Sequence, residues 1–303
     1  MKPKIALTKD LNLYNDQKKR LESLGDVVYH NELLKSPDEW LERCRGADII
    51  CSGIFGLRSD KVYELKDVFI SLPFVGVEFL DKKKLNERNI TISNSPGCNK
   101  EPVSEWIVAM MLIHFRRLLE LTRTKNPSRD EVLKAATSLY DKKITILGAG
   151  FIGKQLGKIC DSLGMKVRFF RRGDDLLESV KDADTVVNCL SVNSSTMEVL
   201  NRDFFFSLKK GAFFVSISKS QVYDIEALKE ALDKEILSGA ADDAASAEVG
   251  DVNEPAYKTL LEHPKILVTP HISWNTDAER RHANDIMIDN IETWIKGKPI
   301  NLI

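Results

Sequence analysis

Three glycines in the middle of the chain have the spacing GxGxxG. They lie within the segment Gly148-Ala149-Gly150-Phe151-Ile152-Gly153. Where a strand turns into a helix, glycines at these positions allow the tight turn, the approach of the backbone to a pyrophosphate and close packing of helix on strand. The amides of the first helical turn then face the anion. The segment, with Phe151 and Ile152 as well as Gly148, Gly150 and Gly153, therefore predicts a dinucleotide-binding turn.

Arg171 and Arg172 lie at the position that distinguishes NAD from NADP in dinucleotide-binding domains of this kind. The acidic residue that binds the ribose 2'-hydroxyl of NAD lies about 20 residues beyond the glycines. Here the end of the second predicted strand reads Phe170-Arg171-Arg172, which has no carboxylate and two guanidinium groups that can bind a 2'-phosphate. Arg171 and Arg172 therefore predict a preference for NADPH, and the competing interpretation is a pair of solvated arginines at a strand end.

The residues around the glycine turn predict the elements that must position it. Ile144 to Leu147 predict a strand, Gln155 to Leu163 have helical spacing, and Val167 to Phe170 predict a second strand. Further strands are expected at residues 185–190, 212–217, 240–241 and 266–268, with a helix at 225–235. Six strands predict a complete doubly wound, Rossmann-type dinucleotide domain.

The first hundred residues predict a second α/β domain. Strands are expected at residues 5–7, 27–29, 47–51, 74–77 and 90–92, and helices at 17–24 and 37–45. This alternation predicts a parallel sheet covered by helices on both faces. Two loops, residues 53–58 and 75–77, follow predicted strands at the carboxyl edge, where open α/β sheets bind ligands.

Two further helices define the domain boundaries. Residues 103–121, after the turn Asn94-Ser95-Pro96-Gly97, predict a strongly apolar helix, and such a helix is buried between domains or subunits. We therefore expect a homodimer. Residues 278–296 predict an amphipathic helix that packs back on the first domain. The predicted domains are residues 1–100 with 276–303, and residues 101–275.

The composition describes an ordinary globular enzyme or binding protein. The chain has 303 residues, 43% hydrophobic and 29% charged, with a net charge of -1, which gives no general attraction to nucleic acid or anionic membranes. The apolar run Trp106 to Ile113 is shorter than the about 18 residues of a membrane span. The five cysteines have neither a disulfide pattern nor zinc spacing, so no metal site is expected. These features predict a cytoplasmic protein.

Several stretches together resemble the D-2-hydroxyacid dehydrogenase family, of the phosphoglycerate, glycerate and hydroxypyruvate dehydrogenase type. They are Phe55-Gly56-Leu57-Arg58-Ser59, Val75-Gly76, Asn94-Ser95-Pro96, Val103-Ser104-Glu105, the glycine turn, Lys210-Gly211-Ala212 and Thr269-Pro270-His271-Ile272. The resemblance covers essentially the whole chain. It implies a Rossmann NAD(P) domain inserted in a flavodoxin-like substrate domain, and hydride transfer between a nicotinamide cofactor and a small 2-oxo or 2-hydroxy acid.

The resemblance also implies roles for individual residues. His271 would be the general acid that protonates the carbonyl oxygen, and Glu248 would pair with it and hold it protonated. Asp243 falls on the aspartate position near the nicotinamide carboxamide. Further cofactor contacts are implied at Thr196 and Ser218, and substrate contacts at Leu57, Arg58, Val75 and Gly76. Ala244-Ala245 departs from the Val-Phe that is common in the family.

The sharpest departure from the family is Lys219. It stands in the segment VSISKSQVYD, where the family has a catalytic arginine followed by glycine. Arginine presents a planar fork to a carboxylate, whereas lysine offers one compact charge on a flexible stem. Arg58 could compensate in part. Lys219 thus predicts a catalytic cation with weaker, differently shaped anion recognition.

Three functions remain open at this point. The leading prediction is an NAD(P)-dependent reductase of a small 2-oxo acid such as glyoxylate or hydroxypyruvate. The second is a nucleotide-binding sensor with a weakened active site, which Lys219 and Ser220 motivate. The third is a dehydrogenase whose substrate has no carboxylate. Turnover of a panel of 2-oxo acids with both cofactors distinguishes them.

Overall fold

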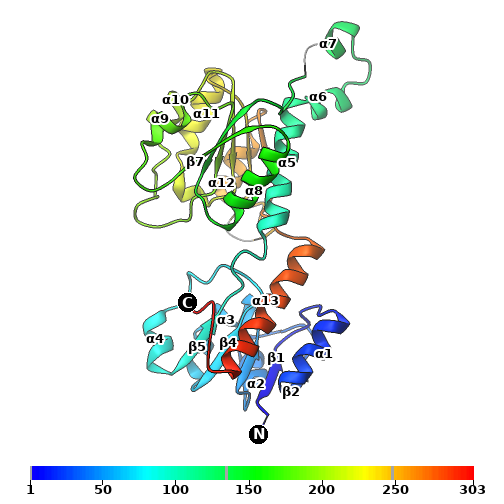
Figure 1. The fold of residues 1–303 in the computed structure, drawn as a ribbon, viewed down its shortest axis with the longest axis vertical. Helices are drawn as coiled ribbons and strands as arrows, with labels where there is room; N and C mark the ends of the chain where they lie inside the picture. Colours follow the sequence, from blue (N-terminus) through cyan, green and yellow to red (C-terminus); the bar gives the residue numbers. More distant parts are fainter. Residues whose placement is uncertain (1, 134–135, 247–248) are drawn as a thin grey trace. The chain divides into compact units, whose positions relative to one another are not determined.

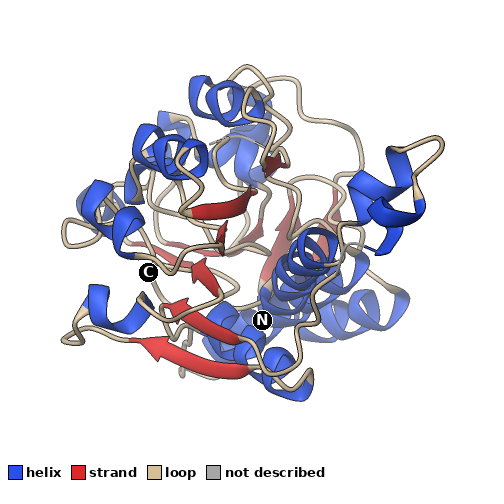
Figure 2. Ribbon diagram, turned by 90° about the horizontal axis from the view of Figure 1, so that it is seen from above, coloured by secondary structure: helices blue, strands red, loops and turns tan. Residues whose placement is uncertain are grey.

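The chain folds into two compact units. The computed structural model of the protein describes residues 2–133, 136–246 and 249–303. Unit 1 consists of residues 1–99 and 276–303, and unit 2 of residues 100–275. Figure 1 labels the helices and some of the strands. Each unit has its own parallel sheet, and helices (blue in Figure 2) flank the strands (red).

Unit 1 contains a five-stranded sheet in the order β2-β1-β3-β4-β5, and all its strand pairs are parallel. Its strands are β1 (Lys4–Leu7), β2 (Asp26–Tyr29), β3 (Ile49–Cys51), β4 (Val68–Ser71) and β5 (Ile90–Ser93). Its helices are α1 (Asn15–Leu24), α2 (Pro37–Cys44), α3 (Ile54–Leu57), the 3-10 turn η1 (Asp60–Glu64), α4 (Lys82–Glu87) and α13 (Asp277–Ile295). This strand order is that of the flavodoxin-like doubly wound fold.

Alternating side chains of the unit 1 strands form a core on each face of the sheet. Ile50 and Ile70 pack with Trp40 of α2 on one face. Ile49 and Phe69 pack on the other face with helices α1 and α13. The Phe69 ring stacks on Trp294 at a centroid distance of 4.4 Å, which fixes α13 against β4. The predicted return of the C-terminal helix to the N-terminal unit is therefore confirmed, and Figure 1 shows α13 beside α1.

Unit 2 contains a six-stranded parallel sheet in the order β11-β10-β9-β8-β6-β7. Its strands are β6 (Lys143–Leu147), β7 (Lys166–Phe170), β8 (Thr185–Asn188), β9 (Ala212–Ser216), β10 (Leu237–Asp242) and β11 (Ile266–Val268). Its helices are α5 (Lys100–Phe115), α6 (Leu118–Arg123), α7 (Arg129–Leu133), α8 (Phe151–Ser162), α9 (Leu176–Val180), α10 (Arg202–Ser207), the 3-10 turn η2 (Ser220–Val222), α11 (Ile225–Asp233) and α12 (Pro255–Leu261).

The unit 2 sheet is doubly wound around β6. The chain passes from β6 to β7 on one side and then places β8 on the other side of β6. Phe213 and Val215 of β9 face the core formed with α5 and α8, while Phe214 faces the core formed with α10 and α11. The predicted six strands and the predicted α/β architecture are confirmed.

The structure corrects two predicted elements. The sequence prediction missed β4 at Val68–Ser71 and placed a strand at residues 74–77, which form an irregular segment after β4. The helix predicted over residues 103–121 is interrupted. α5 ends at Phe115, and Arg117 has a left-handed φ of 53° before α6 begins. Apolar periodicity continued through the break because it reports burial and not backbone dihedral angles.

Among the helices of the described ranges, none combines the length and the apolar character that crossing a membrane requires.

Candidate functional site

The glycine turn joins β6 to α8 at the point where the sheet of unit 2 changes direction. Gly148 has a φ of +105°, and a Cβ atom there would lie 3.0 Å from the carbonyl oxygen of Cys189, in the loop after β8. A Cβ atom on Gly153 would lie 2.1 Å from the Gly148 carbonyl oxygen. Both positions therefore exclude a side chain, and the turn lies at the crevice where doubly wound sheets bind ligands.

The start of α8 has the properties of an anion site. Gly150 is the N-cap and has no side chain to satisfy the first helical amides. A Cβ atom on Gly150 would meet no atom within 4 Å, so the space in front of the turn is open. Phe151 is exposed beside it, and Ile152 packs into the core under α8. Free amides, the positive end of the helix dipole and open space fit a dinucleotide pyrophosphate.

The end of β7 contains a carboxylate that the sequence prediction overlooked. Arg171 and Arg172 are both exposed, directly after the last residue of β7. The Arg171 amide donates a hydrogen bond of 2.8 Å to Oδ2 of Asp174, so an acidic side chain lies within the same turn as the two arginines. The spacing Arg171-x-x-Asp174, typical of a turn closed by aspartate, was the available signal.

Asp243 is buried and organises the loop that carries His271. Its side chain accepts hydrogen bonds from the Thr269 hydroxyl at 2.5 Å, the Ile272 amide at 2.9 Å and the Ser273 amide at 2.8 Å. The donors lie on both sides of His271. One carboxylate thus accepts hydrogen bonds from residues before and after His271 in the loop that follows β11. The sequence prediction gave Asp243 a contact with the nicotinamide carboxamide, and in the structure both of its oxygens accept hydrogen bonds from this loop.

His271 has an unusual backbone and an unpaired ring nitrogen. Its φ is 58°, in the left-handed region that residues with a Cβ atom rarely adopt. Its Nδ1 is buried and has no hydrogen-bond partner among the described residues. Buried polar atoms are normally paired, so this nitrogen requires an acceptor or donor. The predicted partner, Glu248, lies outside the described residues.

Lys219 follows β9, the strand that neighbours β10 in the sheet. It is exposed, it is the N-cap of η2, and its carbonyl accepts a hydrogen bond from the Val222 amide. No ion pair of its ammonium group occurs within the part of the chain that the structure describes. Because β9, β10 and β11 are adjacent and parallel, the segments with Lys219, Asp243 and His271 all emerge at the same edge of the sheet.

Two of the predicted cofactor contacts use their side chains internally. The Ser218 hydroxyl donates to the Leu190 carbonyl at 2.7 Å, which ties the segment after β9 to the loop after β8. The Thr196 hydroxyl donates to the Ser191 carbonyl at 2.6 Å and accepts from the Asn193 amide at 2.9 Å. Both hydroxyls therefore shape loops beside the glycine turn.

The predicted substrate residues lie at the carboxyl edge of the unit 1 sheet, after β3 and β4. Leu57 is buried in the unit 1 core, so its side chain does not reach solvent. Arg58, the C-cap of α3, is exposed, and its guanidinium lies 5.6 Å from the centre of the Phe79 ring. Val75 and Gly76 are exposed. Unit 1 thus presents the Arg58 cation at this edge, beside the exposed residues Val75 and Gly76.

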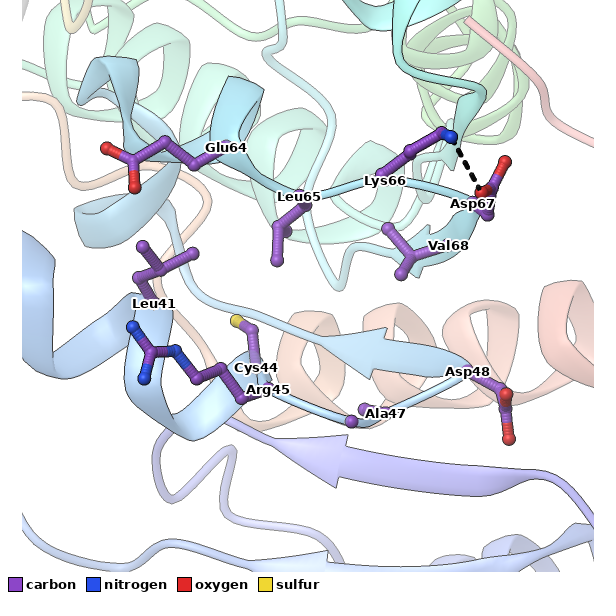
Figure 3. Close-up of a pocket in the computed structure, with 11 residues that line it drawn as sticks. Leu41, Cys44, Arg45, Ala47, Asp48, Glu64, Leu65, Lys66, Asp67 and Val68 are labelled. Atoms are coloured by element: carbon purple, nitrogen blue, oxygen red, sulfur yellow. Dashed lines mark ion pairs between the residues drawn. The ribbon is translucent and has the colours of Figure 1, made fainter.

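A hollow of about 450 Å³ in unit 1 lies away from these residues. Figure 3 shows its lining, which includes Asp48 just before β3 and Asp67 just before β4. It therefore opens at the amino ends of the strands, whereas doubly wound sheets bind ligands at the carboxyl ends. None of the predicted site residues lines it.

The sequence prediction missed a second buried carboxylate, Asp242, next to Asp243. Its Oδ2 accepts a hydrogen bond of 2.9 Å from the Tyr223 hydroxyl, and its Oδ1 accepts one of 2.7 Å from the Ala245 amide. Burial raises the pKa of Asp242 to about 7, the neighbouring Asp243 acts in the same direction, and the two hydrogen bonds oppose the rise. The available signal was two acidic residues within the apolar segment GAADDAA.

Comparison with known proteins agrees with this geometry. Residues 108–273 match the family described as "D-isomer specific 2-hydroxyacid dehydrogenase, NAD binding domain". The chain is 30% identical over 325 residues to the D-3-phosphoglycerate dehydrogenase of Escherichia coli strain K12, covering 98% of this chain and 76% of that protein. It is 25% identical over 306 residues to the hydroxypyruvate reductase of Blautia hydrogenotrophica, covering 94% of each.

A solved structure with the same fold is the D-mandelate dehydrogenase of Rhodotorula graminis. It superposes with a TM-score of 0.83 at 21% identity and covers 100% of this chain and 98% of that one. The family match extends over more than half of the chain and agrees with the resemblance read from its motifs. The chain therefore belongs to the D-isomer specific 2-hydroxyacid dehydrogenase family, and it is an oxidoreductase with a nicotinamide dinucleotide-binding domain.

Proposed function

We propose that the protein reduces a small 2-oxo acid to the D-2-hydroxy acid with NADPH as the preferred cofactor, and that it acts as a homodimer. The observation that carries this proposal is the set of hydrogen bonds by which Asp243 holds the loop on both sides of His271. A buried carboxylate holds His271 in a left-handed conformation with a buried, unpaired Nδ1. Such strain persists where the surroundings enforce it, and it is concentrated at functional sites.

Unit 2 is the proposed cofactor domain. The amides at the start of α8 would hold the pyrophosphate in the open space before Gly150, and Arg171 and Arg172 would face the ribose 2'-phosphate. Ser218 and Thr196 would act through the loops that they shape. When bound, the reduced nicotinamide supplies a hydride for the carbonyl carbon of the substrate.

The chain itself supplies a proton and a cation. His271 donates its proton to the carbonyl oxygen, and Glu248 would hold the imidazole through the nitrogen that is otherwise unpaired. Lys219 binds the substrate carboxylate and polarises the carbonyl group. Unit 1 is the proposed substrate domain, and its candidate substrate contacts are Arg58 and the backbone at Leu57, Val75 and Gly76.

The test is a panel of 2-oxo acids, including glyoxylate, hydroxypyruvate and bulkier relatives, assayed with NADPH and with NADH. We expect turnover of at least one acid. Asp243→Asn should lower kcat on the order of a hundredfold. The amide nitrogen of asparagine cannot accept the hydrogen bond from the Ser273 amide, so the His271 loop should shift. A misplacement of a catalytic group by about 1 Å has an effect of that size. Asp233→Asn is the matched control, since Asp233 ends α11 and contacts His263.

Two results would contradict the proposal. Tight binding of NADPH without oxidation by any 2-oxo acid would favour a sensor. Turnover only of carbonyl compounds that have no carboxylate would mean that Lys219 does not bind a substrate carboxylate.

A further inference from the structure

Asp242 lies in the middle of the three strands that end at the proposed site. It is the last residue of β10 and pairs with Ser216 of β9 on one side and with Val268 of β11 on the other. Its own carbonyl accepts a hydrogen bond of 3.0 Å from the Thr269 amide, at the start of the His271 loop. The residue is 2% exposed, so its carboxylate is almost completely removed from bulk solvent.

One oxygen of Asp242 shapes the turn that contains Asp243. Oδ1 accepts the Ala245 amide at 2.7 Å, which closes a turn of the chain directly after β10. Asp243 is inside this turn, and its own carboxylate holds both sides of His271. The orientation of the Asp243 side chain therefore depends on the Asp242 turn.

The other oxygen of Asp242 reaches the segment that carries Lys219. Oδ2 accepts the Tyr223 hydroxyl at 2.9 Å, and Tyr223 is the residue that caps η2, the short turn that begins directly after Lys219. Tyr223 is 3% exposed, and its ring packs edge to face on Phe214 at a centroid distance of 5.9 Å. Its position is thus fixed by the core as well as by Asp242.

We propose that Asp242 is a positioning residue for the reaction. Its carboxylate, bonded to Tyr223 and to the Ala245 amide, fixes the Lys219 segment relative to the segment that carries Asp243. The inference rests on the proposed function, because it assigns the purpose of this network to the placement of Lys219 and His271. An apolar pair would fill the same core without the energetic penalty of a buried carboxylate, so packing alone does not account for it.

The first experiment separates positioning from folding by its kinetic pattern. Asp242→Leu removes both acceptors and should lower kcat by between about tenfold and a hundredfold, with the KM for NADPH unchanged, because the pyrophosphate site lies on β6 and α8. Asp242→Asn should restore most of kcat, since its amide oxygen accepts the Ala245 hydrogen bond and its nitrogen can donate to the Tyr223 oxygen.

Tyr223→Phe is the second variant, and it keeps the ring and the core packing. It should lower kcat and raise the KM for the 2-oxo acid, because only the link to the Lys219 segment is lost. It therefore remains informative if Asp242→Leu fails to fold. Leu232→Ala, a fully buried change in α11, is the control for lost stability and should leave kcat unchanged below its melting temperature.

Hydrogen exchange of residues 269–273 gives a readout that needs no turnover. The Ile272 and Ser273 amides are bonded to Asp243 and should exchange faster in Asp242→Leu but not in Leu232→Ala. If wild-type protein reduces no 2-oxo acid, the proposed function fails, while exchange still decides this inference. Unchanged exchange in folded Asp242→Leu, or unchanged kcat in both Asp242→Leu and Tyr223→Phe, would overturn it.

Discussion

At the scale of single residues, the candidate site depends on one carboxylate more than on its exposed groups. His271 is held in a left-handed conformation by hydrogen bonds from its neighbours to Asp243. A conformation of this kind costs about 1–3 kcal/mol, so the surrounding contacts must enforce it. The precision of the proposed general acid therefore derives from a residue that does not itself transfer a proton.

Lys219 is predicted to be required for turnover. Lys219→Ala should lower kcat/KM on the best 2-oxo acid by about a hundredfold or more, which is the usual effect of removing one well-placed electrostatic contact. Lys219→Arg should raise activity on glyoxylate or hydroxypyruvate, because arginine adds a second donor for the carboxylate. Lys210→Ala is the control, since Lys210 is exposed just before the same strand. An unchanged kcat/KM in Lys219→Ala would remove this residue from the site.

The buried Asp242 predicts that the stability of unit 2 falls as the pH rises. Its folded pKa is raised from 3.8 to about 7, mainly by burial. The folded state therefore holds a proton that the unfolded state has lost, and stability decreases between about pH 4 and pH 7. Two titratable neighbours also affect the pKa of Asp242: Asp243 raises it, and the hydrogen bond from Tyr223 lowers it.

Chemical denaturation at pH 5 and pH 8 measures this effect. Wild-type protein should lose stability between the two values relative to Asp242→Asn, which has no proton to release, by an amount on the order of a few kcal/mol. Equal pH dependence in the two proteins would mean that Asp242 does not titrate in this range.

At the scale of elements, the end of β7 is predicted to choose the cofactor. Arg171→Asp should shift the ratio of kcat/KM values from NADPH toward NADH, because a carboxylate repels the 2'-phosphate and binds the 2'-hydroxyl. Arg168→Asp, on the same strand but paired with Asp182, should leave the ratio unchanged. The competing interpretation is that Arg171 and Arg172 are only solvated arginines at a strand end. Asp174 bears on it because its carboxylate already lies in the same turn. A clear preference of wild-type protein for NADH would contradict the prediction.

At the scale of the whole molecule, we predict a homodimer formed through α5 and the segments that follow it. Val103, Ile107 and Met111 bury one face of α5 in unit 2. Leu112, Leu118, Val132 and Leu133 remain 37%, 44%, 54% and 65% exposed. Exposed apolar side chains on α5, α6 and α7 favour a protein partner, and a second copy of the chain is the simplest one.

Sedimentation at micromolar concentration tests the dimer. Wild-type protein should sediment as a dimer, and the double substitution Leu118→Glu with Leu133→Glu should yield monomers. Leu177→Glu, at a residue of similar exposure on α9, is the control and should remain dimeric. A stable wild-type monomer would refute the prediction.

The sequence by itself determined the elements and the family. Strand periodicity and the spacing of Gly148, Gly150 and Gly153 predicted both doubly wound sheets, because the residues that form a βαβ unit are neighbours in the chain. The motifs around Arg58 and His271 predicted the family for the same reason: a motif is a local pattern. The periodicity of apolar residues gave wrong predictions where the pattern of burial does not report the backbone conformation. It missed the helix break at Arg117 and the strand at Val68–Ser71.

Only the tertiary structure decided how the candidate site is held together. Residues about 30 positions apart, such as Asp243 and Ser273, meet because β10 and β11 are adjacent and parallel. The pair of Tyr223 and Asp242 forms across neighbouring strand ends in the same way. Aspartate usually lies on the surface, so the apolar neighbours in GAADDAA were the one local sign that Asp242 and Asp243 are buried, and the partners of the two side chains could not be read from it. Hydrogen bonds between distant segments satisfy such charges, and those bonds exist only once the sheet has formed.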